Sequence, residues 1–367
     1  MRREFALQGK AIFVAALFLV AAPIVARAGT ATSGTLYFDT LNTTIPILRP
    51  TGPATVQSVS YTYDGSSNFM LSTPSLIFND SANSNRNTWN ADGLIFAPNG
   101  NLLVGGSTSQ LIWQVTTGGS LVGTASVGGS LPNHLSLSPD GSTIYSGGVS
   151  GDSPGPLGIT PLSPTFANGT SNNVTGSVTG ITQLAFVNGT AYYTSSPDTG
   201  TGNFGTINLS TFVTTQAIAN LTAAHGIAFD PYTGDLILAG GTGTSSHVTQ
   251  INPSNFQIVS DLVVPFSVTM LDQIAVDGKG HLFVTDNGNF AGNLPAGIPG
   301  QLFFLDYSQS KLVNSVSNFS AITTMPLGLD DIAPLSGLGS IPEPASLAFL
   351  CFGAFALLRC RRINRAV

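Results

Sequence analysis

One pattern of hydrophobic and polar positions recurs along most of this chain: one or two polar residues, a short apolar run, a turn and a second apolar run. In the first copy, residues 94–96 form the first run and residues 102–104 the second. The copies, of which the last is truncated, begin at Asp92, Asn133, Thr182, His225, Asp272 and Asp330. Short alternating runs of this kind are typical of half-buried β-strands.

A tight turn joins the two runs of each full copy. The first copy has Asn99 and Gly100 at that point, and the others have Asp140-Gly141, Asn188-Gly189, Thr233-Gly234 and Asp277-Gly278. Glycine accepts a positive φ because it has no Cβ, and Asn and Asp tolerate one. Such a pair between two apolar runs predicts a β-hairpin.

The repeat has the length and strand content of a propeller blade. A third run follows, as at residues 111–115, 206–209, 248–251 and 301–305, and a weaker fourth comes next, as at residues 259–264. Four short strands in about 45 residues make one blade. No stretch between the termini has a convincing 3.6-residue apolar period, so a helical solenoid is not expected. We therefore predict an all-β fold, a β-propeller of four-stranded blades.

The number of blades depends on the residues before the first copy. Residues 35–39, 56–63 and 76–78 read as strands, and the last copy, at Asp330, has only its first strand. Pairing that strand with the N-terminal strands would close the ring as one composite blade. This closure predicts six blades, whereas a separate blade at residues 35–80 would make seven.

Both ends of the chain carry export signals. Residues 1–28 have the form of a signal peptide, with a basic start, an apolar segment over residues 11–25 and the small residues Ala26 and Ala28 at the cleavage site. The propeller is then expected over residues 29–340. Residues 341–367 form a tail in which Pro342, Glu343 and Pro344 precede an apolar segment, and the basic residues that end it are Arg359, Arg361, Arg362 and Arg365.

The tail predicts a temporary membrane anchor. The apolar segment, residues 345–358, is shorter than the roughly 20 residues that usually cross a bilayer, and the arginines would hold its end in the cytoplasm. This order of features resembles the PEP-CTERM sorting signal of exported bacterial proteins. The resemblance implies recognition by an exosortase, cleavage near residues 342–344, and transfer from the inner membrane to the cell surface or extracellular matrix. An ordinary C-terminal membrane anchor is the alternative.

The charge and cysteine content exclude some partners and cross-links. Between Gly29 and Ile341, four basic residues stand against sixteen Asp and no Glu, a net charge of −12 before histidines. A surface of this kind repels phosphate backbones, so nucleic-acid binding is not expected. The only cysteines, Cys351 and Cys360, lie in the tail. The exported domain therefore depends on core burial and ring closure for stability.

Candidate chemistry lies at the starts of the first strands, because these strands line the channel of a propeller. The six starts are Asp92, Asn133, Thr182, His225, Asp272 and Asp330, and the next residues are Gly93, His134, Gln183, Gly226, Gln273 and Asp331. A hydrated channel mouth is one interpretation of their polarity. A calcium ion held by Asp92, Asn133, Asp272 and Asp330 is another, since calcium prefers oxygen ligands. His225 or His134 could then act as a general base.

The ring is similar to that of six-bladed gluconolactonase-like and regucalcin-like enzymes, where the resemblance implies a metal in the channel mouth. Those enzymes use a Glu in the first blade, and this domain has none. His247 and His281 have no partner in sequence and are expected at the surface or in turns. The sequence thus favours a non-catalytic binding or structural role, with a polysaccharide or protein partner at loops such as residues 79–90, 150–180 and 287–300. A secreted, lactonase-like hydrolase or lyase is the alternative.

Overall fold

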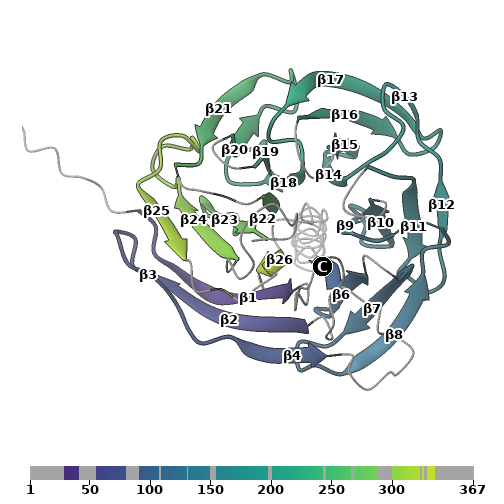
Figure 1. Cartoon of the computed structure of the whole chain (residues 1–367), viewed down its shortest axis with the longest axis horizontal. Helices are drawn as coiled ribbons and strands as arrows, with labels where there is room; N and C mark the ends of the chain where they lie inside the picture. Colours follow the sequence, from purple (N-terminus) through teal and green to yellow (C-terminus); the bar gives the residue numbers. More distant parts are fainter. Residues whose placement is uncertain are drawn as a thin grey trace, which may run out of the picture.

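A computed structural model describes the exported domain as six β-sheets around a central axis (Figure 1). The described residues contain strands and no helix, and they are residues 29–40, 55–79, 91–106, 109–129, 131–148, 154–196, 201–242, 245–265, 268, 270–287, 300–322, 325 and 329–334. None of these residues forms a helix that could span a bilayer. The predicted signal peptide and the C-terminal tail, with its predicted transmembrane segment, lie outside the described residues. The prediction of an all-β propeller is confirmed, with six blades and not seven.

In the first five blades the four main strands run outward from the axis in chain order. The first blade contains β5 (Ala91–Phe96), β6 (Leu102–Gly106), β7 (Leu111–Val115) and β8 (Leu121–Ser126). The second contains β9 (His134–Leu137), β10 (Thr143–Gly147), β11 (Leu157–Pro161) and β12 (Thr170–Asn172). The third contains β14 (Gln183–Val187), β15 (Thr190–Ser195), β16 (Gly202–Asn208) and β17 (Val213–Leu221), and the short β13 (Thr175–Gly176) pairs with β17 in parallel.

The next two blades repeat this order. The fourth contains β18 (Gly226–Asp230), β19 (Asp235–Gly240), β20 (His247–Ile251) and β21 (Ile258–Val263). The fifth contains β22 (Leu271–Val276), β23 (His281–Asp286), β24 (Gln301–Asp306) and β25 (Asn318–Ile322). The predicted hairpin turns between first and second strands are present, with positive φ at Gly100, Asn188 and Gly234, among others.

The sixth blade joins the two ends of the domain. Its innermost strand is β26 (Leu329–Pro334), followed outward by β1 (Thr32–Thr40) and β2 (Thr55–Tyr63). Both β3 (Phe69–Leu71) and β4 (Ser75–Asn79) pair with the outer edge of β2. The pairing of β26 with β1 is antiparallel and sets Phe38 opposite Ile332. The predicted composite blade is thereby confirmed.

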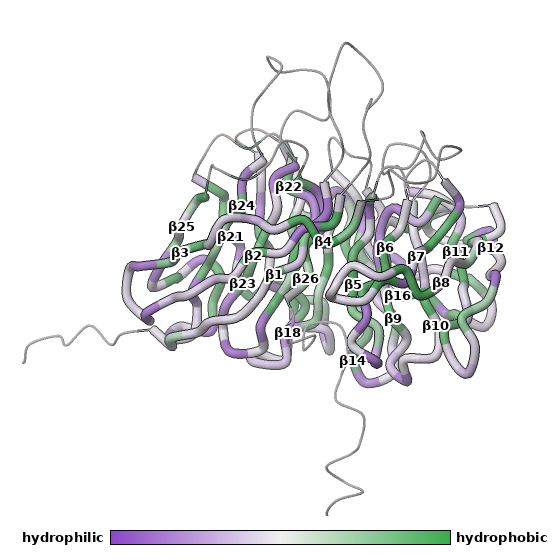
Figure 2. Tube along the Cα trace, turned by 90° about the horizontal axis from the view of Figure 1, so that it is seen from below, coloured by the Kyte–Doolittle hydropathy of each residue, from purple (hydrophilic) through white to green (hydrophobic). Residues whose placement is uncertain are grey.

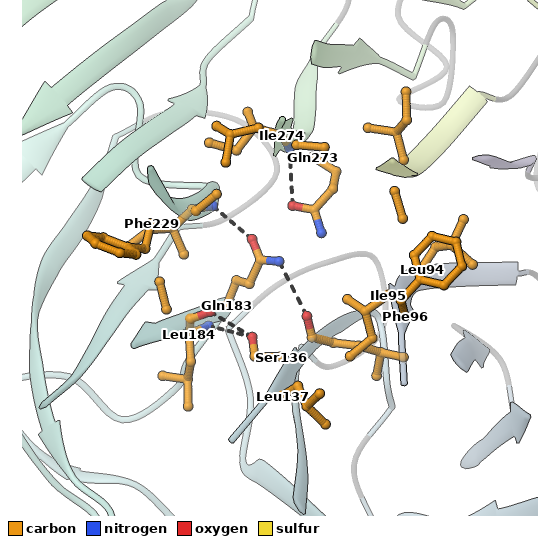
Figure 3. A pocket seen from close by; sticks show the side chains of 18 of the residues that line it. Leu94, Ile95, Phe96, Ser136, Leu137, Gln183, Leu184, Phe229, Gln273 and Ile274 are labelled. Atoms are coloured by element: carbon orange, nitrogen blue, oxygen red, sulfur yellow. Dashed lines mark hydrogen bonds between the residues drawn. The ribbon is translucent and has the colours of Figure 1, made fainter. Parts of the chain in front are cut away.

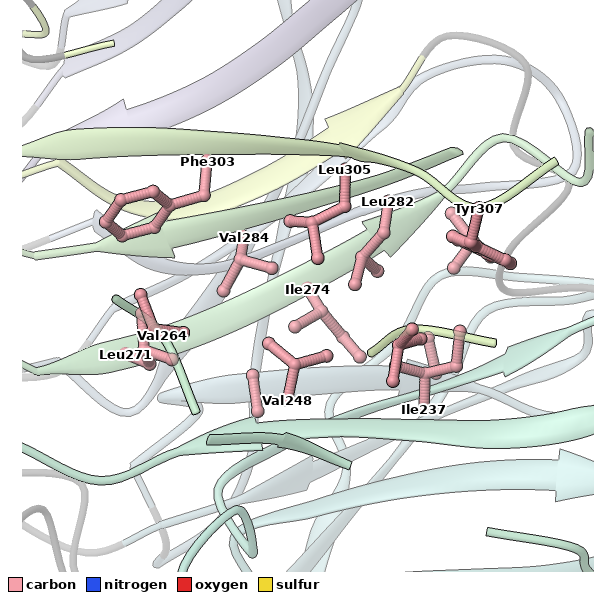
Figure 4. Packing of buried hydrophobic residues seen from close by; sticks show 14 of the residues in the cluster. Ile237, Val248, Val264, Leu271, Ile274, Leu282, Val284, Phe303, Leu305 and Tyr307 are labelled. Atoms are coloured by element: carbon pink, nitrogen blue, oxygen red, sulfur yellow. The ribbon is translucent and has the colours of Figure 1, made fainter. Parts of the chain in front are cut away.

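The core lies between neighbouring blades, not in one central mass. Between the fourth and fifth blades, side chains from both sheets interdigitate, among them Ile237, Val248, Leu271 and Phe303 (Figure 4). Strands alternate their side chains between two faces, and each blade is covered on both faces by its neighbours, so the middle strands are buried on both sides. In side view, the strands run between the two faces of the disc (Figure 2). This packing holds the innermost strands in fixed positions around the axis.

Candidate functional site

The six predicted strand-start residues meet around the axis, and all six are buried. None of Asp92, Asn133, Thr182, His225, Asp272 and Asp330 is more than 3% exposed. His134 and Asp331, at the next repeat position, are 0% exposed. The convergence of six strands on a narrow axis thus places these side chains against one another and away from the surface.

Two histidines and an aspartate from three blades form the centre of this ring. His225 Nε2 lies 3.1 Å from His134 Nε2 and 3.1 Å from Asp272 Oδ1. His134 Nε2 lies 3.8 Å from the same carboxylate oxygen, and the two imidazoles meet edge to face. Because a neutral imidazole nitrogen is a good ligand and a carboxylate oxygen is another, these three atoms form a possible metal-binding group.

A second carboxylate lies on the other side of His134. Asp331 Oδ1 is 3.8 Å from His134 Nδ1, and Asp92 completes a group of three potential ligands with these two residues. Asp331 itself is held firmly: its Oδ2 accepts a hydrogen bond from the Leu94 backbone N–H at 2.9 Å, and its own N–H donates to Asp39 Oδ1 at 2.8 Å. Of the predicted calcium-binding aspartates, Asp92 and Asp272 belong to these two groups of described residues, whereas Asp330 belongs to neither.

Polar residues just below the ring join neighbouring blades. Gln183 Oε1 accepts a hydrogen bond from the Ile227 N–H of the next blade, and Ser136 Oγ accepts one from the Leu184 N–H (Figure 3). The inner edge of each first strand has no further strand to pair with, so its backbone groups need other partners. Side chains from the adjacent blade supply them. Much of the polarity at these repeat positions therefore has a structural purpose.

Gly93 and Gly226, which directly follow the strand-start residues Asp92 and His225, are glycines because the backbone of the next blade is too close for a side chain. A Cβ on Gly226 would lie 2.3 Å from the Asp272 carbonyl oxygen, and one on Gly93 would lie 2.8 Å from the Asn133 carbonyl oxygen. Gly93 also has a φ of +85°. At this repeat position the chain has glycine where the backbone of the next blade leaves no room for a side chain, and a polar residue in the other copies.

Burial and neighbouring charges shift the pKa values of three carboxyl groups around the axis, those of Asp39, Asp272 and Asp330. Burial raises the pKa of Asp39 well above its ordinary value, and the charge of Asp331 adds to the rise. Burial also raises the pKa of Asp330, helped by the charges of Asp92 and Asp272. Burial alone would raise the pKa of Asp272, but interactions with His225, Asp330 and His134 together hold it below its ordinary value. The two imidazoles thus favour a charged Asp272 at the centre.

The channel below the ring contains a small, largely apolar cavity. It has a volume of about 70 Å³, and its walls come from all six innermost strands, with Leu94, Leu135 and Ile332 next to the ring residues. Gln183 and Gln273 are the larger polar side chains that line it (Figure 3). The ring therefore lies at one end of a largely apolar channel, and the residues that form the inter-blade hydrogen bonds, Ser136 and Gln183, also line this channel.

Sequence reasoning missed one residue beside this centre, Asp39, and misjudged the burial of a histidine elsewhere in the fifth blade, His281. Asp39 lies on β1, outside the repeat, and no local pattern marks it. His281 was expected at the surface or in a turn but is 0% exposed, and its Nδ1 and Nε2 lie 2.7 Å from Asp277 Oδ2 and 2.8 Å from the Thr30 carbonyl oxygen. It thereby fixes the N-terminal segment to the fifth blade. His247 lies at the outer part of the fourth blade, where it pairs with Asp261.

Comparisons with solved structures concern the fold. A protein of unknown function from Bacteroides caccae is similar with a TM-score of 0.53 and 12% identity, over 83% of this chain and 99% of that one. Kuenenia stuttgartiensis hydrazine synthase is similar with a TM-score of 0.50 and 12% identity, over 77% of this chain and 86% of that one. No curated protein matches the chain.

The tail gives the more specific result. Residues 340–362 match the PEP-CTERM protein-sorting motif, in agreement with the order of residues 342–344, apolar segment and arginines noted above. The motif covers a small part of the chain and says nothing of the chemistry of the ring. The chain is an exported six-bladed β-propeller with a PEP-CTERM signal, which marks it for exosortase processing and direction to the surface.

Proposed function

We propose that this protein has a non-catalytic binding or structural role at the cell surface or in the extracellular matrix, with a polysaccharide or surface protein as its partner. The observation that carries the proposal is the chemistry of the outer rim, defined here as strands β3, β4, β8, β12, β21 and β25 together with β17 and the short β13 on its edge (Figure 1). The sorting motif supports it, because it directs the protein to the place where such partners are found.

The rim exposes large apolar side chains. Eight of them are between 42% and 61% exposed, and they are Met70, Leu76, Leu121, Val122, Val213, Ile258, Val259 and Val263. All eight belong to rim strands. Exposed apolar side chains in groups are typical of interaction surfaces, and an outer strand also offers unpaired backbone groups to a partner.

The rest of the rim is almost uncharged. Asp261 is the one charged residue of these strands, and most of the others are Thr, Ser, Asn, Gln, Ala or Gly. Natural edge strands are commonly protected by lysines or other charges. A surface of hydroxyl, amide and apolar groups instead suits a neutral polymer or a strand-like protein segment. It does not suit a polyanion.

The proposal is tested by cosedimentation of the purified full-length chain with matrix polysaccharide from the bacterium that encodes it. A rim variant, Leu121→Ser with Val122→Ser, should bind about tenfold more weakly, the effect of losing about 1.4 kcal/mol of contact energy. His225→Gln, which alters the ring alone, serves as the matched control and should bind as the original chain does. Equal binding by the rim variant and the original chain would contradict the proposal.

A second candidate function, a secreted lactonase-like hydrolase, is favoured by one observation. His225 and His134 are imidazoles held beside Asp272 at one end of an apolar cavity. An imidazole that accepts a proton from water, next to a carboxylate that orients it, has the parts of a general base. Lactone hydrolysis that is present in the original chain and lost in His225→Gln would support this function over the binding role.

A further inference from the structure

We propose that His134, His225 and Asp272 bind a divalent transition-metal ion of the zinc class, and that Asp331 positions His134 for this purpose. The ligand atoms would be the two Nε2 atoms and Asp272 Oδ1. This inference goes beyond the binding role of the rim and does not depend on it, because the two sites share no residue.

The spacing of the three atoms fits such an ion. They form a triangle with sides of 3.1, 3.1 and 3.8 Å. A triangle with these sides has a point that is about 2.0 Å from all three corners, and zinc binds histidine nitrogen and carboxylate oxygen at about 2.0–2.2 Å. The side chains therefore reach a common ion without a change of backbone.

The donor set favours a transition metal over calcium. Calcium takes six to eight oxygen ligands, whereas imidazole suits zinc, copper, iron and nickel. The sequence suggested calcium because the ring is rich in carboxylates, but the structure brings both ring histidines to one point. Two imidazoles and one carboxylate are a common ligand set for catalytic zinc and for non-haem iron, and they leave at least one coordination position open.

The scaffold holds the three ligands in place before any ion binds. His134 begins β9, His225 directly precedes β18, and Asp272 is the second residue of β22, so each comes from a different innermost strand. All three are at most 2% exposed. Such side chains lose little conformational entropy on binding, and sites built on strands are more precise than sites on loops.

Asp331 has its carboxylate on the side of His134 where metal-binding histidines usually have an outer partner. It lies 3.8 Å from Nδ1 of His134, on the opposite side of the imidazole from Asp272. A carboxylate at this point favours the tautomer with the proton on Nδ1, which leaves the Nε2 lone pair for the ion. The hydrogen bonds of Asp331 to the backbone of β5 and to Asp39 fix its orientation.

The test is titration of the metal-free, full-length chain with cobalt(II), whose visible absorption reports both binding and coordination geometry. We expect one cobalt ion per chain, with bands typical of four- or five-coordinate sites, and competition by zinc. His134→Gln and His225→Gln should each weaken binding at least 100-fold, and Asp331→Asn by about tenfold, the lower end of the effect of outer-shell residues. His247→Gln is the matched control, because it removes a histidine that pairs with Asp261 outside the ring.

A ring variant could lose binding simply because it unfolds, so two further measurements are needed. Each variant is compared with the original chain by circular dichroism and thermal unfolding in the presence of chelator. X-ray absorption of the zinc-bound original chain should show two imidazoles at about 2.0 Å. Unchanged cobalt binding in both His→Gln variants, a zinc spectrum without imidazole, or full displacement of cobalt by millimolar calcium would each overturn the proposal.

Discussion

His134 contributes both of its ring nitrogens to the centre of the molecule, one towards His225 and Asp272 and the other towards Asp331. It can do so because its side chain extends from the start of an innermost strand, where the carboxyl groups of three other blades also arrive. Burying several carboxyl groups together is unfavourable unless some remain protonated or a cation neutralises them. The raised pKa values of Asp39 and Asp330 are the consequence of this arrangement.

Asp39→Asn should make the metal-free protein more stable at neutral pH. Because the folded-state pKa of Asp39 is raised, its contribution to stability is fully present below its unfolded value of about 3.8 and is lost as the pH rises through the folded-state value. The variant has no such loss, and it can still accept the Asp331 N–H bond. The gain at neutral pH should be about 1.4 kcal/mol for each unit by which the pKa is raised.

The measurement is urea unfolding of both chains in chelator, from pH 4 to pH 8. The difference between the two chains isolates Asp39 from other carboxyl groups, such as Asp306, whose pKa is lowered in the fold and which acts in the opposite direction. A difference in stability that does not grow with rising pH would contradict the prediction.

Strand β1 is the element that closes the ring, since it pairs with β26 on one side and β2 on the other. Aromatic side chains then join the composite blade to the fifth blade. Phe69 stacks on Phe304 with ring centres 4.2 Å apart, and the Tyr63 hydroxyl donates a hydrogen bond to Asp306 Oδ2 at 2.7 Å. The seam between the first and last parts of the domain thus has both apolar and polar contacts.

Phe304→Ala should lower the free energy of unfolding by about 3–5 kcal/mol, because it removes a fully buried ring and leaves a cavity at the closing seam. Urea unfolding followed by fluorescence or circular dichroism measures the loss. Met70→Ala, which truncates a rim side chain that is 61% exposed, should change the same quantity by less than about 0.5 kcal/mol. Similar losses in the two variants would mean that the seam contributes little to stability.

At the scale of the whole molecule, the domain is a closed ring without cysteines, attached to a tail that directs its export. Closure pairs both edges of β1 and leaves the outer edges of the blades open, which is why the proposed partner surface lies on the rim. The central ring of His and Asp residues lies at the axis, remote from that rim. The proposed ion site and the proposed partner surface therefore share no residue, and each can be tested without altering the other.

Replacing Pro342, Glu343 and Pro344 with alanines should leave the protein in the membrane fraction, because exosortase would no longer process the tail. Cell fractionation followed by immunoblotting compares the variant with the original chain. Ser336→Ala, which lies before the motif, should be released as the original chain is. Normal release of the triple variant would show that this motif does not control sorting.

The sequence alone determined the features that depend on neighbours along the chain. Alternating apolar runs and Asn-Gly or Asp-Gly turns predict hairpins because strand alternation and turn conformation are local, and the regular recurrence of these hairpins predicts blades. The order of motifs along the chain likewise identified the sorting tail. The repeat alignment placed five residues at the starts of channel strands: Asp92, His134, His225, Asp272 and Asp331. It also anticipated that β26 would pair with the N-terminal strands.

Only the tertiary structure decided which of these residues touch. His134 and His225 are 91 residues apart in sequence, and Asp39 and Asp331 are 292 apart, so their contacts depend on the ring closing with six blades. Burial of the strand starts, the cluster of two imidazoles with Asp272, and the exposed apolar rim all follow from packing between blades. A repeat pattern is the same whichever blade lies opposite, and for that reason it could not show which of the strand-start residues would meet as a buried cluster.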